Sequence, residues 1–540
     1  MINSSFPWLT SLILVPLVGA GLVWALPGGL RRWARHVAVG VSLVALGLAV
    51  LVLLAFDISS AGTVQLTEQV SWIPAFGVNY ALGVNGVGLL LVLLSALLVP
   101  VVLLAAWREH PDAEDGDAKD GDANAAGDGS PAAAPGRRIR DYVALILVLE
   151  SLTIAVFAAR DVFLFYVLFE AMLIPVYFMI GAFGGAQRRY AAVKFLIYSL
   201  AGGLVMLVGV IALYVQGPGG PDGFLIDTLA GTEMATWVER AIFASFFLAF
   251  AIKAPMWPVH TWLPDAAEQA PAGTNVLLVG VLDKVGTFGM LTLCLPLFPA
   301  ASRWAAPVII VLAVTSILYG AFLAIGQEDL MRLIAYTSVS HFGFIVLGIF
   351  AFTSVSTQGA SLYMFTHGLS TGALFLLAGF LVARWGTARI GAYGGLQRGL
   401  PILAGTFLVA GLSALSLPGL APFVSELLVF VGTFAANRPA AVVATLGVVL
   451  AALYVLVTYQ RIFTGPRPES LGARPDLTGR ERWVVGPLIA GLLVFGLYPA
   501  PAIDLVRDPA TQTVADLGIA DLSAETAAAP ERDTDDGSDQ

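Results

Sequence analysis

Cysteine is almost absent from this sequence of 540 residues, and its scarcity excludes several kinds of site. The single cysteine, Cys294, lies within an apolar run. One cysteine cannot form an intrachain disulfide, and no cysteine-based metal or iron–sulfur site can be built from it. The sequence also lacks a Walker Gly-Lys-Ser/Thr motif and a dinucleotide-binding glycine motif. We therefore expect no metal, no nucleotide and no flavin on this chain.

Charged residues are also scarce. They make up 12% of the chain, 58% is hydrophobic, and the mean hydropathy is +0.84. A soluble domain carries roughly 25% charged residues. Many of the acidic residues that give the net charge of -9 lie in two low-complexity segments, so this charge does not indicate a basic partner. We also expect no nucleic-acid binding. The composition predicts a multi-pass protein of the lipid bilayer.

Apolar runs of about 20 residues, enough to cross a bilayer, predict an all-α polytopic fold of about fourteen transmembrane helices. The runs lie at 6–26, 36–56, 81–106, 141–158, 162–183, 190–215, 238–262, 272–295, 305–326, 333–352, 358–383, 401–434, 439–462 and 483–505. Most lysines and arginines fall in the loops that are cytoplasmic if the N-terminus lies outside. The positive-inside rule then predicts a plasma or inner cell membrane, with both termini on the outer face.

Two of these helices contain prolines that interrupt them. Lys253 is followed by Pro255 and Pro258 in helix 7, and Pro418 and Pro422 precede Glu426 in helix 12. Proline removes a backbone donor and breaks a helix, and paired broken segments in two halves indicate a transporter built from repeats. We predict discontinuous helices 7 and 12 in two inverted five-helix repeats, formed by helices 4–8 and 9–13.

These boundaries divide the chain into six regions. They are helices 1–3 (1–106), a disordered cytoplasmic loop rich in Asp, Gly and Ala (107–140), the first inverted repeat (141–295), the second inverted repeat (305–462), helix 14 (483–505) and a disordered acidic tail (506–540). Neither disordered segment is expected to carry chemistry.

Ionisable residues inside the predicted helices are the candidate functional residues, because charge within a bilayer is costly. They form a series along the chain: Glu150, Glu170, Lys194, Lys253, Lys284, His341, His367 and Glu426, with Asp283 beside Lys284. Such a series is suited to passing protons sideways through the membrane. Each residue also has a structural alternative: Lys253 can cap freed carbonyls, Lys194 can snorkel, Glu426 can cap a half-helix, and the histidines can bond nearby Ser or Thr.

Six strings resemble the antiporter-like subunits of respiratory complex I and the related Mrp cation/proton antiporters. They are FLFYVLFEAMLIPVYFMIG (163–181), KAPMWPVHTWLPD (253–265), DKVGTFG (283–289), AYTSVSHFGF (335–344), HGLSTGALF (367–375) and LPGLAPFVSE (417–426). An acid at position 426, where the sister subunits L and N carry lysine, is typical of the M-type branch.

The resemblance implies a proton path that is driven by quinone reduction elsewhere in a complex. In it Glu170 pairs with Lys253, the proton passes Lys284, His341 and His367, and Glu426 faces the exit; Lys194 and Glu150 are weaker candidates. Partners would be other membrane-arm subunits, especially L and N, while NADH, FMN, iron–sulfur clusters and quinone would belong to other subunits. A Mrp-type Na⁺/H⁺ antiporter subunit and a membrane subunit of an energy-converting hydrogenase remain alternatives.

Overall fold

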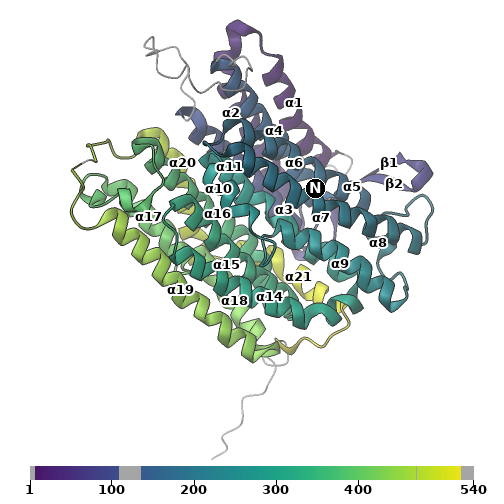
Figure 1. The fold of residues 1–540 in the computed structure, drawn as a ribbon. Helices are drawn as coiled ribbons and strands as arrows, with labels where there is room; N and C mark the ends of the chain where they lie inside the picture. Colours follow the sequence, from purple (N-terminus) through teal and green to yellow (C-terminus); the bar gives the residue numbers. More distant parts are fainter. Residues whose placement is uncertain (1–5, 109–134, 470, 524–540) are drawn as a thin grey trace, which may run out of the picture.

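The computed structural model describes residues 6–108, 135–469 and 471–523, and helices fill most of it (Figure 1). Within these residues, eleven helices are long and apolar enough to cross a membrane, or up to twelve if one bent pair counts as a span. The chain is therefore a mostly helical, multi-pass membrane protein. The count is lower than the fourteen predicted helices because the two interrupted segments are not counted. The helix before the first break, α9 (Thr236–Lys253), carries three charged residues. The helices on either side of the second break, α17 (Pro401–Ala414) and α18 (Ala421–Ala436), are short.

The N-terminal region contains a β-hairpin between its helices, which corrects the all-α prediction. Helices α1 (Trp8–Ala25) and α2 (Ala34–Ala55) precede two antiparallel strands, β1 (Gln65–Ile73) and β2 (Val78–Val84). The helix predicted at 81–106 begins only at α3 (Gly86–Ala105), because β2 is a short apolar run that merges with it in sequence. The Asn85 side chain accepts a hydrogen bond from Gly88 N and so marks the true helix start.

The other helices follow the predicted order with small shifts. They are α4 (Pro135–Ala158), α5 (Val162–Ala171), α6 (Leu173–Phe183), α7 (Arg188–Gln216), α8 (Ile226–Leu229), α10 (Trp262–Gln269), α11 (Ala272–Leu277), α12 (Lys284–Gly289), α13 (Leu295–Leu297), α14 (Pro299–Ile325), α15 (Leu330–Phe350), α16 (Ser354–Trp385), α19 (Arg438–Phe463), α20 (Gly479–Leu497) and α21 (Ala500–Asp516). Two π-helical turns, Leu278–Leu282 and Met290–Cys294, lie on either side of α12.

Both predicted helix breaks are present and share one local geometry. In the first, α9 ends at Lys253, and Met256 N donates to Ala251 O at 3.0 Å. In the second, α17 ends at Ala414, and Leu417 N donates to Leu412 O at 3.0 Å. Each break thus closes with a hydrogen bond to the carbonyl five residues earlier. The carbonyl that Pro255 leaves without its helical donor, Ala251 O, is therefore satisfied by the backbone.

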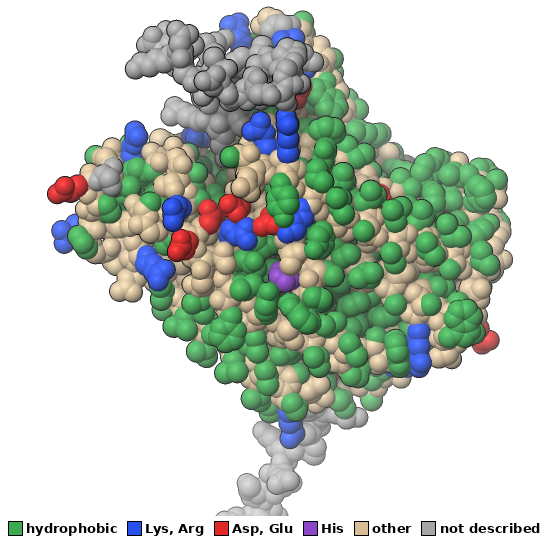
Figure 2. Space-filling view, in the orientation of Figure 1, with side chains coloured by type: hydrophobic (Ala, Val, Ile, Leu, Met, Phe, Trp, Pro, Cys, Tyr) green, Lys and Arg blue, Asp and Glu red, His purple; other side chains and the backbone are tan. Residues whose placement is uncertain are grey.

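The centre and the periphery of the bundle differ in burial. The most hydrophobic windows of Ala272–Leu297, Leu330–Phe350 and Ser354–Trp385 are 94%, 94% and 89% buried, but those of Arg188–Gln216 and Arg438–Phe463 are only 39% buried. Figure 2 shows hydrophobic side chains over most of one face. Because lipid is as apolar as these side chains, the peripheral helices need no protein cover. The central helices are the ones that carry Lys284, His341 and His367.

The C-terminal region differs from its prediction. The helix expected at 483–505 is split by a 68° bend between α20 and α21. Residues 506–516, predicted to begin a disordered tail, belong to α21, where Leu505, Val506 and Ala510 are buried and so order the segment. Residues 524–540 of the tail and most of the 107–140 loop lie outside the described residues, and α4 begins at Pro135, within that predicted loop.

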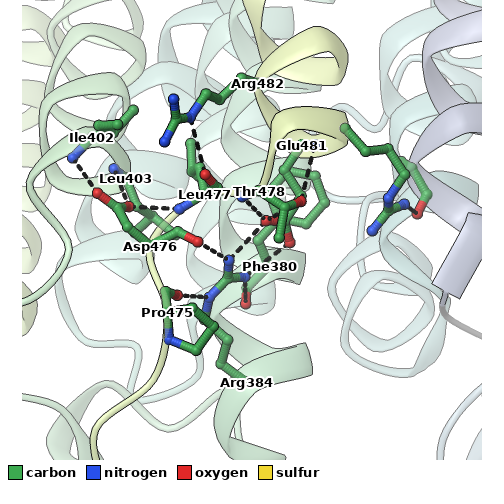
Figure 3. A network of polar contacts seen from close by, with 12 residues as sticks. Phe380, Arg384, Ile402, Leu403, Pro475, Asp476, Leu477, Thr478, Glu481 and Arg482 are labelled. Carbon is green, nitrogen blue, oxygen red and sulfur yellow. Dashed lines mark hydrogen bonds and ion pairs between the residues drawn. The ribbon is translucent and has the colours of Figure 1, made fainter.

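A polar clamp at the start of α20 holds the discontinuous segment α17/α18 in place (Figure 3). The Asp476 carboxylate accepts hydrogen bonds from Ile402 N at 2.8 Å and Leu403 N at 3.0 Å, and so caps α17. Beside it, Arg384 of α16 forms a buried ion pair with Glu481 at 2.8 Å. The same guanidinium donates to three carbonyls, those of Phe380, Pro475 and Asp476. The clamp joins the ends of α16, α17 and α20.

Candidate functional site

A row of buried polar side chains runs across α12, α15, α16 and α18. Four predicted residues belong to it: Lys284, His341, His367 and Glu426, whose exposed fractions are 0%, 4%, 2% and 5%. Buried polar groups are costly unless they are hydrogen-bonded. Their partners therefore decide what the row can do.

Lys284 begins the connected part of the row. Its Nζ donates to Val279 O at 2.5 Å and lies 2.7 Å from His367 Nδ1. Val279 belongs to the π-helical turn just before α12, where the usual helical hydrogen-bond pattern is interrupted. The π-helical turn thus supplies a carbonyl for Lys284, and the lysine joins α12 to α16.

The two histidines lie next to each other without a hydrogen bond between them. Their ring centroids are 5.2 Å apart. His367 Nε2 contacts Thr371 Oγ1 at 3.0 Å, whereas His341 Nε2 is buried and has no hydrogen-bond partner among the described residues. Because neutral imidazole has one donor and one acceptor nitrogen, His341 Nε2 is free to accept a proton.

Tyr363 links the histidines to the acid of α18. Its hydroxyl donates to Glu426 Oε2 at 2.8 Å and lies 2.6 Å from His341 Nδ1. A tyrosine has one hydroxyl proton, so the hydrogen in the contact with His341 comes from Nδ1. This contact supports the tautomer of His341 in which Nε2 is the acceptor.

Ser416 completes the environment of Glu426 from inside the second helix break. Its Oγ donates to Glu426 Oε2 at 2.5 Å. The residue has a φ of 57°, in the left-handed region that non-glycine residues seldom adopt. The break therefore aims a hydroxyl at the carboxyl group, which an intact helix would not do.

Tyr363, Thr371 and Ser416 were missed by the sequence reasoning. Tyr363 and Thr371 lie four residues before and after His367 on α16, so all three side chains share one helix face. That spacing was the available signal, but Tyr and Thr within an apolar helix also fit ordinary packing. Ser416 gave a weaker signal, because its position depends on the shape of the break.

The first half of the row is not connected. Lys253 is 1% exposed, and its Nζ has no hydrogen-bond partner among the described residues; it lies 5.0 Å from the centre of the Phe169 ring. Lys253 therefore does not cap the carbonyls at the break. The expected partner, Glu170, does not pair with it here, and the Glu170 carboxyl oxygens have no described partner either. Glu150 and Asp283 are buried and equally unpartnered in this part of the chain.

Gly286 brings the two lysine-bearing helices together. A Cβ atom at this position would lie 2.5 Å from Phe250 O and 2.8 Å from Ala254 N. Glycine therefore lets α12 pack directly on the end of α9, next to Lys253.

Lys194 belongs to a different group, near the predicted cytoplasmic end. Its Nζ pairs with Asp265 at 2.6 Å, and Arg332 pairs with both Asp265 at 2.6 Å and Glu268 at 2.8 Å. Burial raises the pKa of Asp265, but hydrogen bonds from Lys194 and Arg332 outweigh it and hold that pKa below its ordinary value. The network ties α7 and α10 to α15, which favours a structural role for Lys194.

Comparisons with known proteins identify the family of this chain. Residues 159–453 match the family described as NADH:quinone oxidoreductase/Mrp antiporter, TM. NADH-quinone oxidoreductase subunit M of Mycobacterium tuberculosis is 49% identical, over 95% of each chain. Subunit M of Rhodobacter capsulatus is 37% identical, over 94% of this chain and 98% of its own.

A solved structure has the same fold. A chain of respiratory complex I from Thermus thermophilus superposes with a TM-score of 0.82 at 31% identity, covering 95% of this chain and all of its own. Sequence and fold therefore agree over nearly the whole length. The chain belongs to the NADH:quinone oxidoreductase/Mrp antiporter family, as an antiporter-like, proton-translocating membrane subunit of the M type.

Proposed function

We propose that protons cross this subunit along the buried row from Lys253 to Glu426. The observation that carries the proposal is the hydrogen-bonded contact of Lys284 with His367, together with the Tyr363 hydroxyl that joins His341 to Glu426. These contacts measure 2.6–2.8 Å, within the range needed for proton transfer.

The transfer follows from the donors and acceptors present. The Lys284 ammonium gives a proton to His367 Nδ1, and His367 passes one on to the free His341 Nε2. His341 then gives its Nδ1 proton to Tyr363 as Tyr363 gives its own to Glu426. After these transfers Lys284 is a neutral amine, both histidines and Tyr363 are neutral, and Glu426 is a protonated acid. No charge is left on the tyrosine.

Two steps of this path require more than the described contacts. The histidine rings do not hydrogen-bond to each other, and Lys253 has no bonded link to Lys284. A bridging water or a side-chain rotation must complete each step, and water-mediated hydrogen bonds are nearly as strong as direct ones. Control of proton transfer is therefore expected at these two steps.

The proposal extends to the whole subunit. Of about fourteen proposed helices, helices 4–8 and helices 9–13 form two inverted five-helix repeats, each with one of the two breaks, and both termini lie on the outer face. Quinone reduction on other subunits, which hold NADH, FMN and the iron–sulfur clusters, drives proton export here. Its partners are other membrane-arm subunits, especially the sister subunits L and N. The similar geometry of the two breaks and the M-type relatives support this reading.

The test uses two substitutions of Lys253 in the assembled complex in membrane vesicles. Lys253→Ala removes the proton carrier, and Lys253→Arg keeps the charge but cannot release a proton. We expect both to reduce NADH-driven proton pumping by at least about tenfold, as loss of a positioned proton donor typically does. Lys194→Arg is the control, since arginine can keep the pair with Asp265, and it should pump normally.

Two outcomes would contradict the proposal. Normal pumping by Lys253→Arg would make Lys253 a structural cation. Purification of the tagged chain with cation-antiport partners and without NADH:quinone reductase activity would favour a stand-alone antiporter. Normal assembly is checked in each variant by its NADH:quinone reductase activity after solubilisation.

A further inference from the structure

The Glu170 carboxyl group occupies a space that exists only because residue 203 is glycine. A Cβ atom built on Gly203 of α7 would lie 1.6 Å from Glu170 Oε1, 2.4 Å from Cδ and 2.9 Å from Oε2. All three distances are shorter than non-bonded atoms allow. The side chain of Glu170, from α5, is therefore turned against the backbone of α7 at this position.

The neighbouring glycine shows that this space is specific to Gly203. Gly202 faces α9 instead, where an added Cβ would meet Ile252 Cδ1 at 2.9 Å and Ala249 Cα at 3.2 Å. One glycine of the pair thus lets α9 pack closely, and the other receives the carboxyl group. Only the space at Gly203 can be filled without moving a backbone, because a Cβ atom there would meet the flexible end of the Glu170 side chain.

The space offers the carboxyl group no hydrogen bond. Both oxygens are covered, and neither has a partner among the described residues. Burying an unpaired carboxylate costs far more than burying a neutral acid. The position therefore suits an uncharged Glu170, whereas a position beside Lys253 suits a charged one.

We infer that Gly203 provides a second resting position for the Glu170 carboxyl group, and that Glu170 moves between this position and Lys253 during proton transfer. The inference rests on the proposed function. It makes Gly203 a positioning residue that acts through Glu170: when the carboxyl group lies against Gly203, it makes no hydrogen bond to Lys253, and Lys253 can pass on its proton more readily. With the Gly203 position blocked, the carboxyl group stays beside Lys253.

The test is Gly203→Ala, because the added methyl group blocks the position and displaces only a flexible carboxyl group. In vesicles containing the assembled complex, we expect the rate of NADH-driven proton export to fall about tenfold, as loss of a positioned proton donor typically does. Gly209→Ala is the matched control on the same helix: its methyl group would meet the Ser245 hydroxyl at 2.0 Å. It should pump as the unmodified protein does.

A double-mutant comparison separates positioning from damage to the fold. In the Glu170→Ala background no carboxyl group is left to occupy the space at Gly203, so adding Gly203→Ala should change the remaining pumping little. Infrared difference spectra should also show a shifted carboxyl C=O band in Gly203→Ala alone, because the group has moved to new surroundings.

Three results would overturn the inference: normal pumping by Gly203→Ala, an equal loss in both backgrounds, or an unshifted carboxyl band. The proposed function fails separately, if Lys253→Arg pumps normally. If Glu170→Gln pumps normally, Glu170 takes no part in the transfer. If Glu170→Gln abolishes pumping and Gly203→Ala does not, only the second resting position is wrong.

Discussion

At the residue scale, Tyr363 makes the contact on which the connected row depends. Its one hydroxyl meets His341 of α15 and Glu426 of α18, and these two groups have no direct hydrogen bond among the described residues. A tyrosine hydroxyl can accept one proton while it gives another. Without it the histidines and the acid are separated.

Tyr363→Phe should therefore interrupt the proposed proton path and leave the packing intact. We expect NADH-driven proton pumping in vesicles to fall by about tenfold or more, because phenylalanine keeps the ring and removes the hydroxyl. Tyr459→Phe is the control: this tyrosine lies on α19, and its ring stacks on Phe463 at 4.9 Å. Equal pumping by both variants would exclude Tyr363 from the path.

At the scale of elements, the buried pair of Arg384 and Glu481 holds three helix ends together. Both side chains are 8% exposed, and the guanidinium uses its fixed geometry to reach the carboxylate and three carbonyls. Lysine has the charge but not the planar fork. The position of α17, and with it the second break, depends on this geometry.

Arg384→Lys should lower the thermal stability of the detergent-solubilised protein. Breaking a buried pair costs about 3–5 kcal/mol when a charge is left unpaired, and lysine recovers only part of that. The control is Arg389→Lys, since the pair of Arg389 with Glu328 is 75% and 81% exposed and 3.3 Å long. An equal fall in melting temperature for both variants would show that the buried Arg384–Glu481 pair stabilises the protein no more than an exposed pair does.

At the scale of the molecule, Asp265 links the two halves of the chain. It accepts from Lys194 of the first half and from Arg332 of the second. Because its pKa in the folded state lies below the ordinary value of 3.8, its stabilisation is present above that value and is lost as the pH falls through the lowered pKa.

Asp265→Asn should remove this pH-dependent part of the stability. At neutral pH we expect a loss of about 1 kcal/mol for each partly exposed pair. On acidification to about pH 3, the difference in melting temperature between the original protein and Asp265→Asn should narrow. Melting curves at several pH values check this, and a difference that widens on acidification would contradict the assigned pairs.

Local features of the sequence determined the membrane class, most spans and both breaks. Long apolar runs require a bilayer, and the paired prolines near Lys253 and Glu426 favour a helix break, because each removes a backbone donor and crowds the preceding turn. The buried ionisable residues could also be named in advance, because a charged side chain within a membrane helix is costly and is usually kept for function.

Only the tertiary structure decided how those residues are connected. Whether Tyr363 reaches Glu426, whether Glu170 lies beside Lys253 or against Gly203, and which carbonyl Lys284 meets depend on the packing of helices far apart in sequence. A sequence pattern records which groups are buried, but hydrogen bonds are formed by the neighbours that packing supplies.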